Sequence, residues 1–211
     1  MKYPTLILLF TLYCSVLSAQ SHVITIKTGI SRTNISSSLL DYEFQNNYIA
    51  GISYDYKVNK NLSLGCEFLY EERGGNLIFT FNHSNGNPQE QYTVLYEFNY
   101  FSLPIKLSYT IGNVFFGFCS IGVCPAMLRN SIVTYPDGYL DHFVDPMATI
   151  PPTYSKFDFA GFSEIGCGYK LSDRFSIDIS GRFQQSTTLL IENLDGSNFG
   201  VTIGLGLKYY F

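Results

Sequence analysis

The chain has 211 residues, of which 46% are hydrophobic and only 14% are charged, and its net charge is −4 at pH 7. Soluble domains carry roughly 25% charged residues, so an ordinary soluble surface is doubtful, and the apolar content excludes a disordered chain. The sequence contains no basic run, which argues against nucleic acid as a partner. Its 17 Tyr, 18 Phe and 18 Gly, with no Trp, indicate β-strands rather than helices.

The N-terminus predicts an export signal. Lys2 supplies a positive charge, an apolar stretch follows, and Ser18-Ala19 provides a small-residue cleavage site. The apolar stretch is shorter than the ~20 residues that a membrane-spanning helix needs. We therefore expect residues 1–19 to be a cleaved signal peptide and residues 20–211 to form the mature domain.

Alternation of apolar and polar residues, which is typical of β-strands, runs through the mature chain. The C-terminus is the clearest case, because Val201, Ile203 and Leu205 share one face and are separated by Thr and Gly. The same alternation predicts eight strands, at about 22–32, 47–58, 61–72, 94–109, 113–128, 156–170, 174–187 and 197–211.

The connections between these strands alternate in length. Short periplasmic turns with long outer loops and an even number of strands are typical of transmembrane β-barrels. The expected fold class is therefore all-β: an eight-stranded antiparallel up-and-down transmembrane β-barrel with four long outer loops and three short periplasmic turns. The short turns lie near 57–61, 110–113 and 170–173, and the long loops span about 33–46, 73–93, 129–155 and 188–196.

A lipocalin is the soluble alternative, because it combines eight strands with a signal peptide. A lipocalin would need an apolar interior and a polar exterior. In this chain the polar face is rich in Gly and small residues with isolated charges, which suits a narrow interior. The apolar face ends in Tyr or Phe, as in the aromatic girdles of a bilayer-facing barrel. We therefore expect the apolar face to contact lipid.

The alternation places charged residues on the inner face. An eight-stranded barrel is just wide enough for side chains to fill it, so opposite charges should pair there. The alternatives are a narrow water or ion path through the same residues, or carboxylate pairs that perform acid–base chemistry. The expected interior charged network consists of Lys27, Asp55, Lys57, Glu67, Glu71, Lys106, Asp158, Glu164, Asp178, Arg182 and Lys208.

Two outer loops are expected to project from the barrel. The segment 73–75 interrupts the third strand, after which the apolar residues change parity, and the fourth strand shows a matching change. A β-bulge at the membrane boundary would explain both changes and predicts a hairpin beyond the bilayer with its tip near 83–89. The turn signature at 135–139 predicts a second, smaller projection. The candidate contact residues are Phe79, Phe81, Tyr135 and Tyr139, with packing among the loops as the alternative.

The sequence shows no recognisable catalytic or metal-binding motif. His22, His83 and His142 have no recognisable spacing to a Ser or Cys nucleophile. The acidic residues within 137–145 lack the spacing of a known calcium loop. We therefore expect no enzymatic activity, no metal and no cofactor. Four cysteines are expected as unpaired small hydrophobes, with a Cys119–Cys167 disulfide as the alternative: Cys66, Cys119, Cys124 and Cys167.

Two stretches resemble one protein family. Residues 204–211 form a glycine-rich strand that ends in Phe, and residues 100–109 contain an aromatic-x-x-(I/L)-P-hydrophobic pattern. The chain is similar over its whole mature length to small porin-type outer-membrane β-barrel proteins of Bacteroidetes-like bacteria. This resemblance implies the outer membrane of a Gram-negative bacterium and contact with outer-membrane lipid. The C-terminus also resembles the signal that the barrel-assembly machinery reads during biogenesis, here Leu207, Tyr209 and Phe211.

The resemblance leaves activity open, because such a family is defined by its barrel rather than by a shared reaction. The leading expectation is a non-enzymatic integral membrane protein with a structural or surface-interaction role, whose extracellular loops meet an unknown extracellular or envelope partner. A narrow porin-like channel for water, ions or small solutes is the first alternative. An accessory component of an outer-membrane secretion or assembly apparatus is the second.

Overall fold

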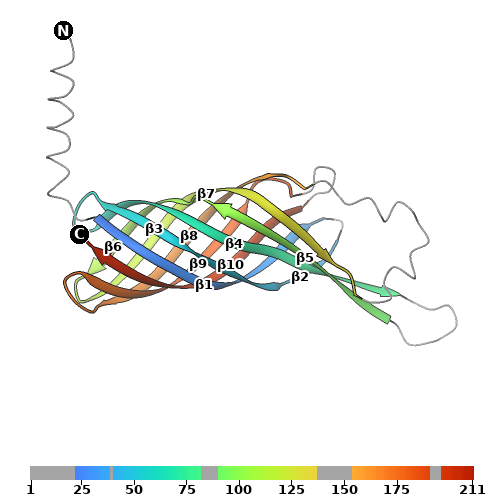
Figure 1. Cartoon of the computed structure of the whole chain (residues 1–211), viewed down its shortest axis with the longest axis horizontal. Helices are drawn as coiled ribbons and strands as arrows, with labels where there is room; N and C mark the ends of the chain where they lie inside the picture. The colour runs from blue at the N-terminus through green and yellow to red at the C-terminus, as the bar shows by residue number, and fades with distance from the viewer. Residues whose placement is uncertain (1–21, 39, 82–89, 137–153, 191–195) are drawn as a thin grey trace, which may run out of the picture.

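The computed structural model describes residues 22–38, 40–81, 90–136, 154–190 and 196–211. Ten strands within these residues form one closed antiparallel sheet (Figure 1). No helix of the described part is long and apolar enough to span a membrane. The expected signal peptide at 1–19 lies outside the described residues.

The ten strands form a ring of eight wall strands, which confirms the expected eight-stranded antiparallel barrel. The strand β2 is a two-residue addition beside β4, and β5 and β6 form one wall strand that Leu103 and Pro104 interrupt. Proline has no N–H to donate to a ladder, so the break falls where the sequence forbids a regular bond. The strands are β1 (His22–Ser37), β2 (Tyr42–Glu43), β3 (Gln45–Lys57), β4 (Leu62–Phe81), β5 (Glu90–Ser102), β6 (Ile105–Gly112), β7 (Phe115–Thr134), β8 (Phe157–Lys170), β9 (Phe175–Ser186) and β10 (Gly196–Tyr210).

The first and last strands close the barrel, because β1 pairs with both β3 and β10. The described ends of the chain lie at the same end of the barrel as the connections β3–β4, β6–β7 and β8–β9 (Figure 1). We call this the short-turn end and the opposite one the long-loop end. Gly112, with a φ of 106°, begins the tight β6–β7 turn in a conformation that favours glycine.

The two faces of the wall differ as the alternation predicts. Ile203 of β10 is 54% exposed on the outer surface, whereas Glu164 of β8 and Arg182 of β9 are buried inside. This arrangement is the inverse of a soluble protein, and it suits a barrel with hydrocarbon outside and side chains filling the lumen.

The predicted bulge in the third and fourth strands is wrong. The β4–β5 ladder runs without interruption from the Leu69–Ser102 pair to the Phe81–Glu90 pair. The apolar residues that suggested a change of face instead point into the barrel: Leu77 is 3% exposed and Phe98 is fully buried. The inner face therefore changes in character, from charged to apolar, while the backbone register continues.

An irregularity does occur one strand farther along. The pairing of β5 with β7 shifts between Asn99 and Tyr100, which lie opposite Asn130 and Leu128. Arg129 of β7 is the extra residue at this point. A bulge of this kind bends the strand that contains it, so the deviation belongs to β7 rather than to the predicted hairpin.

Several strands extend farther into the long-loop end than the sequence predicted. β4 continues to Phe81 and β7 to Thr134, across segments that were expected to be loops. β4 and β5 reach beyond the other strands (Figure 1). The predicted hairpin tip at 83–89 lies outside the described residues.

Candidate functional site in the barrel interior

The centre of the barrel is occupied by buried ion pairs built around Glu67 of β4. Its carboxylate accepts hydrogen bonds from Lys27 Nζ at 3.2 Å, Lys106 Nζ at 2.9 Å and Arg182 Nη2 at 2.6 Å. These three cations come from β1, β6 and β9, so one carboxylate joins four different strands. Alternation places all four residues on the inner face, which is why they can meet.

Glu164 of β8 is the second acceptor at this level. It accepts from Lys27 Nζ at 2.6 Å, Arg182 Nη2 at 3.1 Å and Ser180 Oγ at 2.8 Å. Asp55 lies 3.3 Å from Lys106 and adds a third carboxylate. Buried charges are tolerated where they are paired and hydrogen-bonded, and here the three cations and three carboxylates balance. We call this group the central cluster: Lys27, Asp55, Glu67, Lys106, Glu164 and Arg182.

A second buried group lies closer to the long-loop end. Arg73 of β4 pairs with Glu71 on its own strand and with Asp158 of β8, whose Oδ2 is 2.5 Å from Arg73 Nη1. Ser102 Oγ donates to Glu71 at 3.0 Å, and Ser186 Oγ donates to Asp158 at 2.7 Å. We call this group the arginine cluster: Arg73, Glu71, Asp158, Ser102 and Ser186.

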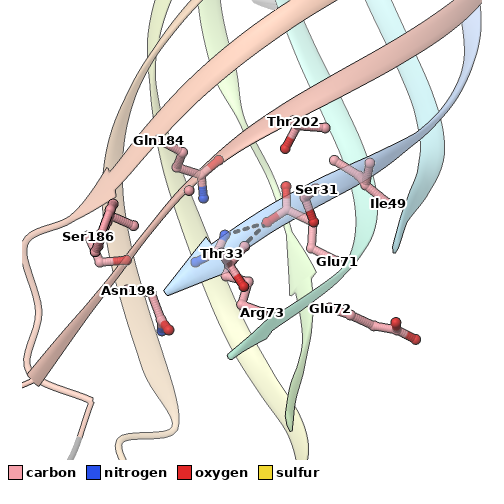
Figure 2. Close-up of a pocket in the computed structure, with 12 residues that line it drawn as sticks. Ser31, Thr33, Ile49, Glu71, Glu72, Arg73, Gln184, Ser186, Asn198 and Thr202 are labelled. Atoms are coloured by element: carbon pink, nitrogen blue, oxygen red, sulfur yellow. Dashed lines mark hydrogen bonds and ion pairs between the residues drawn. The ribbon is translucent and has the colours of Figure 1, made fainter. Parts of the chain in front are cut away.

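A small cavity of about 30 Å³ borders the arginine cluster. Figure 2 shows the Arg73–Glu71 pair on one side of it and Gln184, Ser186 and Asn198 on the other. A volume near 30 Å³ corresponds to one water molecule. A neighbouring cavity beside Lys27 and Glu164 measures about 10 Å³. Both spaces are small beside the roughly 300–1,000 Å³ of typical small-molecule sites.

An apolar layer lies next to the arginine cluster, on its long-loop side. Phe98 and Tyr100 of β5 are fully buried, and the ring of Tyr100 lies 4.8 Å from the Arg73 guanidinium carbon. The Phe98 ring packs against Tyr154 with a centroid distance of 4.9 Å. We call this layer the apolar plug: Ile35, Phe98, Tyr100, Ala126 and Leu190.

The short-turn end, by contrast, opens into a cavity of about 590 Å³. We call this cavity the vestibule. Asp55 and Lys106 of the central cluster line it, and Lys57 and Lys208 line it nearer the mouth. Lys208 Nζ lies 3.2 Å from Asp178 and 4.4 Å from the centre of the Phe118 ring.

The eleven charged residues predicted for the interior fall into these three levels. Six form the central cluster, and Glu71 and Asp158 belong to the arginine cluster. Lys57 and Lys208 line the vestibule, and Asp178 lies behind that lining as the partner of Lys208. The sequence analysis missed Arg73, because its segment was interpreted as the start of a loop. The odd-numbered inner positions continue from Glu67 through Glu71 to Arg73, and this parity could have identified it.

The predicted contact residues lie on the long-loop side. Phe79 and Phe81 are in β4, Tyr135 follows β7, and Tyr139 is outside the described residues. The proposed assembly signal lies at the short-turn end, where the Tyr209 ring packs against those of Phe175 and Phe211 at 5.1 and 5.0 Å. Leu207 faces outward on the same strand.

The described residues contain no group of three His, Cys, Asp or Glu side chains that could hold a metal ion. The acidic segment at 137–145 lies outside the described part, as do His83 and His142. His22 Nδ1 lies 2.6 Å from the hydroxyl of Tyr54, at the start of β1. The four described cysteines are unpaired, and Cys124 alone among them is buried inside, 3.7 Å from Arg73.

The sequence matches a family model described as outer membrane protein beta-barrel domain over residues 18–192. No curated protein matches it. The structure is similar to that of the outer membrane protein OprG from Pseudomonas aeruginosa, with a TM-score of 0.55 and 9% identity over 91% of this chain and 97% of that one. It is also similar to Neisserial surface protein A, with a TM-score of 0.52 and 10% identity over 89% of this chain and 97% of that one. At these identities the likeness is one of fold.

Proposed function

Because the chain belongs to the outer membrane protein beta-barrel domain family, we propose that it is a closed, non-enzymatic barrel that presents its long-loop end to a partner outside the cell. The family membership places the barrel in an outer membrane of the Gram-negative type, with its apolar surface in lipid. Binding of a partner by the long-loop end goes beyond this family assignment and rests on the features below.

The observation that carries the proposal is the asymmetry of the lumen. Among the described residues, the apolar plug and the two buried clusters occupy the interior between its centre and the long-loop end, and two cavities beside these clusters measure about 30 and 10 Å³. A narrow channel would need a continuous wet path, and hydrophobic constrictions exclude water. This filling supports a scaffold role over conduction.

The shape of the long-loop end supports an interaction role. The β4–β5 ladder continues through Ile78–Phe81 and Glu90–Thr93 after every other described pairing of these two strands has ended. Within it, Phe79 lies opposite Tyr92, an aromatic pair of the kind that stabilises two-stranded ladders. The result is a stiff extension beyond the wall, and binding residues are commonly placed on such projections by a rigid scaffold. We call this segment the projecting hairpin.

A site-specific photo-crosslinker at Gln91, an exposed residue of the projecting hairpin, tests this role in intact cells. We expect a discrete crosslinked protein band after irradiation. The control carries the crosslinker at Ile203, which faces lipid and should give no such band. A surface-exposed, folded protein that gives no band from Gln91, or the same band from both positions, would contradict the proposal.

A further inference from the structure

The vestibule at the short-turn end has an excess of positive charge. Its volume of about 590 Å³ lies within the range of small-molecule sites, roughly 300–1,000 Å³. Its lining contains a single carboxylate, that of Asp55. Five lysines line it as well: Lys57, Lys60, Lys106, Lys170 and Lys208.

Two of these five lysines are compensated by carboxylates, whereas Lys57, Lys170 and the exposed Lys60 are not. Lys106 pairs with Asp55 and Glu67, and Lys208 pairs with Asp178. Among the described residues, no carboxylate oxygen pairs with Lys57 or Lys170. The described residues therefore place cations at the mouth of the vestibule without carboxylates paired to them.

Two of the uncompensated lysines lie beside one aromatic ring. Lys57 Nζ lies 4.8 Å and Lys170 Nζ 5.8 Å from the centre of the Tyr210 ring. The positive charges of Lys170 and Lys208 both act on Lys57. Like charges held together in a partly enclosed space repel one another, and a bound anion would relieve that repulsion.

The rest of the lining suits an organic anion rather than a bare ion. The hydroxyls of Ser108 and Ser120 lie 2.8 Å apart on the wall and can turn toward a ligand oxygen. Phe116 and Phe118 add flat apolar surface to the lining. Ligand sites typically combine such apolar walls with a few polar groups that fix orientation.

We propose that the vestibule is a blind binding site for a small organic anion with at least two phosphate or carboxylate groups, which enters from the periplasmic side. Lys57 and Lys170 bind the charged groups, and the phenylalanine rings contact the body of the molecule. The central cluster forms the floor, so the ligand leaves by the mouth through which it entered. This site does not depend on the projecting hairpin or its partner.

The test uses the refolded protein in nanodiscs of zwitterionic phosphatidylcholine, titrated with pyrophosphate and with citrate by calorimetry. We expect saturable binding of one molecule per barrel by at least one of the two anions, weaker at high salt because of screening. Binding of pyrophosphate alone assigns the site to phosphates, and binding of citrate alone assigns it to carboxylates. Neutral glucose should not bind.

Substitutions locate the site. Lys57→Gln and Lys170→Gln should each weaken binding about tenfold, the loss expected for one charge-assisted hydrogen bond. Lys57→Arg should retain most of the affinity. The matched control is Lys156→Gln, which removes the same charge from an exposed position at the opposite end and should leave the affinity unchanged.

Heat-modifiable gel mobility establishes that each variant is folded. If Lys57→Gln does not fold, Lys170→Gln, at the last residue of β8, carries the comparison. The proposal is overturned if neither anion binds in a saturable way. It is equally overturned if Lys156→Gln weakens binding as much as the vestibule variants do, because the attraction would then be diffuse.

Discussion

Arg73 of β4 reaches across the lumen to Asp158 of β8, with Arg73 Nη1 2.5 Å from Asp158 Oδ2. The two strands are not neighbours in the sheet, so this ion pair joins separate parts of the wall. The pair also separates the charged centre of the barrel from the apolar plug, since the same guanidinium lies beside the ring of Tyr100. The Arg73 side chain thus connects β4 with β8, and it contacts both the charged interior and the apolar plug.

Replacing this guanidinium should destabilise the barrel strongly. Arg73→Met leaves Glu71 and Asp158 buried without their cation, and breaking a buried pair in this way costs about 3–5 kcal/mol. The measurement is urea-induced unfolding of the protein in lipid vesicles. Arg129→Met, at the exposed extra residue of β7, is the control and should change stability by less than about 0.5 kcal/mol. Equal effects of the two substitutions would show that the arginine cluster is not a stabilising unit.

Neutralising the centre of the barrel should cost more than neutralising its rim. Glu67→Gln removes the charge that three cations share, with an expected loss of about 3–5 kcal/mol. Asp178→Asn removes the partner of Lys208, and Lys208 lines the open vestibule. This substitution should lower the free energy of unfolding clearly less. Parallel unfolding curves in the same vesicles compare the two variants. A larger loss for Asp178→Asn would contradict the view that the central cluster dominates.

The intact barrel should not conduct ions. In a planar bilayer we expect no steady discrete openings from correctly folded protein, because the apolar plug and the paired charges of the adjacent clusters occupy the described interior, where two cavities measure about 30 and 10 Å³. Lys106→Gln and Glu164→Gln should leave the baseline unchanged. Discrete openings whose size shifts in these two variants would instead assign the interior charges to a conducting path.

Removal of the final residue should affect assembly rather than the finished fold. Phe211 packs on Tyr209 at the short-turn end, and it is 62% exposed, so its removal leaves the buried clusters in place. Deleting it should lower the amount of folded barrel in cells several-fold, while refolding of the purified protein into lipid remains near normal. Comparing heat-modifiable mobility in the two settings measures this. Removing the exposed Leu171 side chain by Leu171→Ala serves as the control at the same end. An equal loss of folded barrel in cells and in refolding of the purified protein into lipid would show that Phe211 stabilises the fold rather than directing assembly.

The sequence was sufficient to predict the barrel because the faces of most strands differ sharply. In β10 every second residue from Val201 to Leu207 is an exposed aliphatic, and the residues between them are Thr or Gly. The strand count and the inward direction of the charged residues follow from that alternation and from the alternating loop lengths.

The same reasoning failed where the interior is apolar. Leu77 and Phe98 point inward, so a rule that equates apolar with outward assigns them to the wrong face and requires a bulge that is absent between β4 and β5. Arg73 was then assigned to a loop. The apolar plug could not be predicted, because its residues come from β1, β5, β7 and the segment after β9, and their meeting depends on the stagger of the closed sheet.

The uninterrupted ladder between β4 and β5 couples the projecting hairpin mechanically to the barrel wall. The strand that extends beyond the wall at Phe79 also contains Arg73 inside the barrel, with no bulge or break between these two residues in its pairing with β5. A pull or twist on the projecting end is therefore transmitted along a continuous hydrogen-bonded ribbon into the buried ion pairs. A foreign peptide grafted in place of residues 82–89 would likewise be displayed on a stem whose root is fixed in the wall.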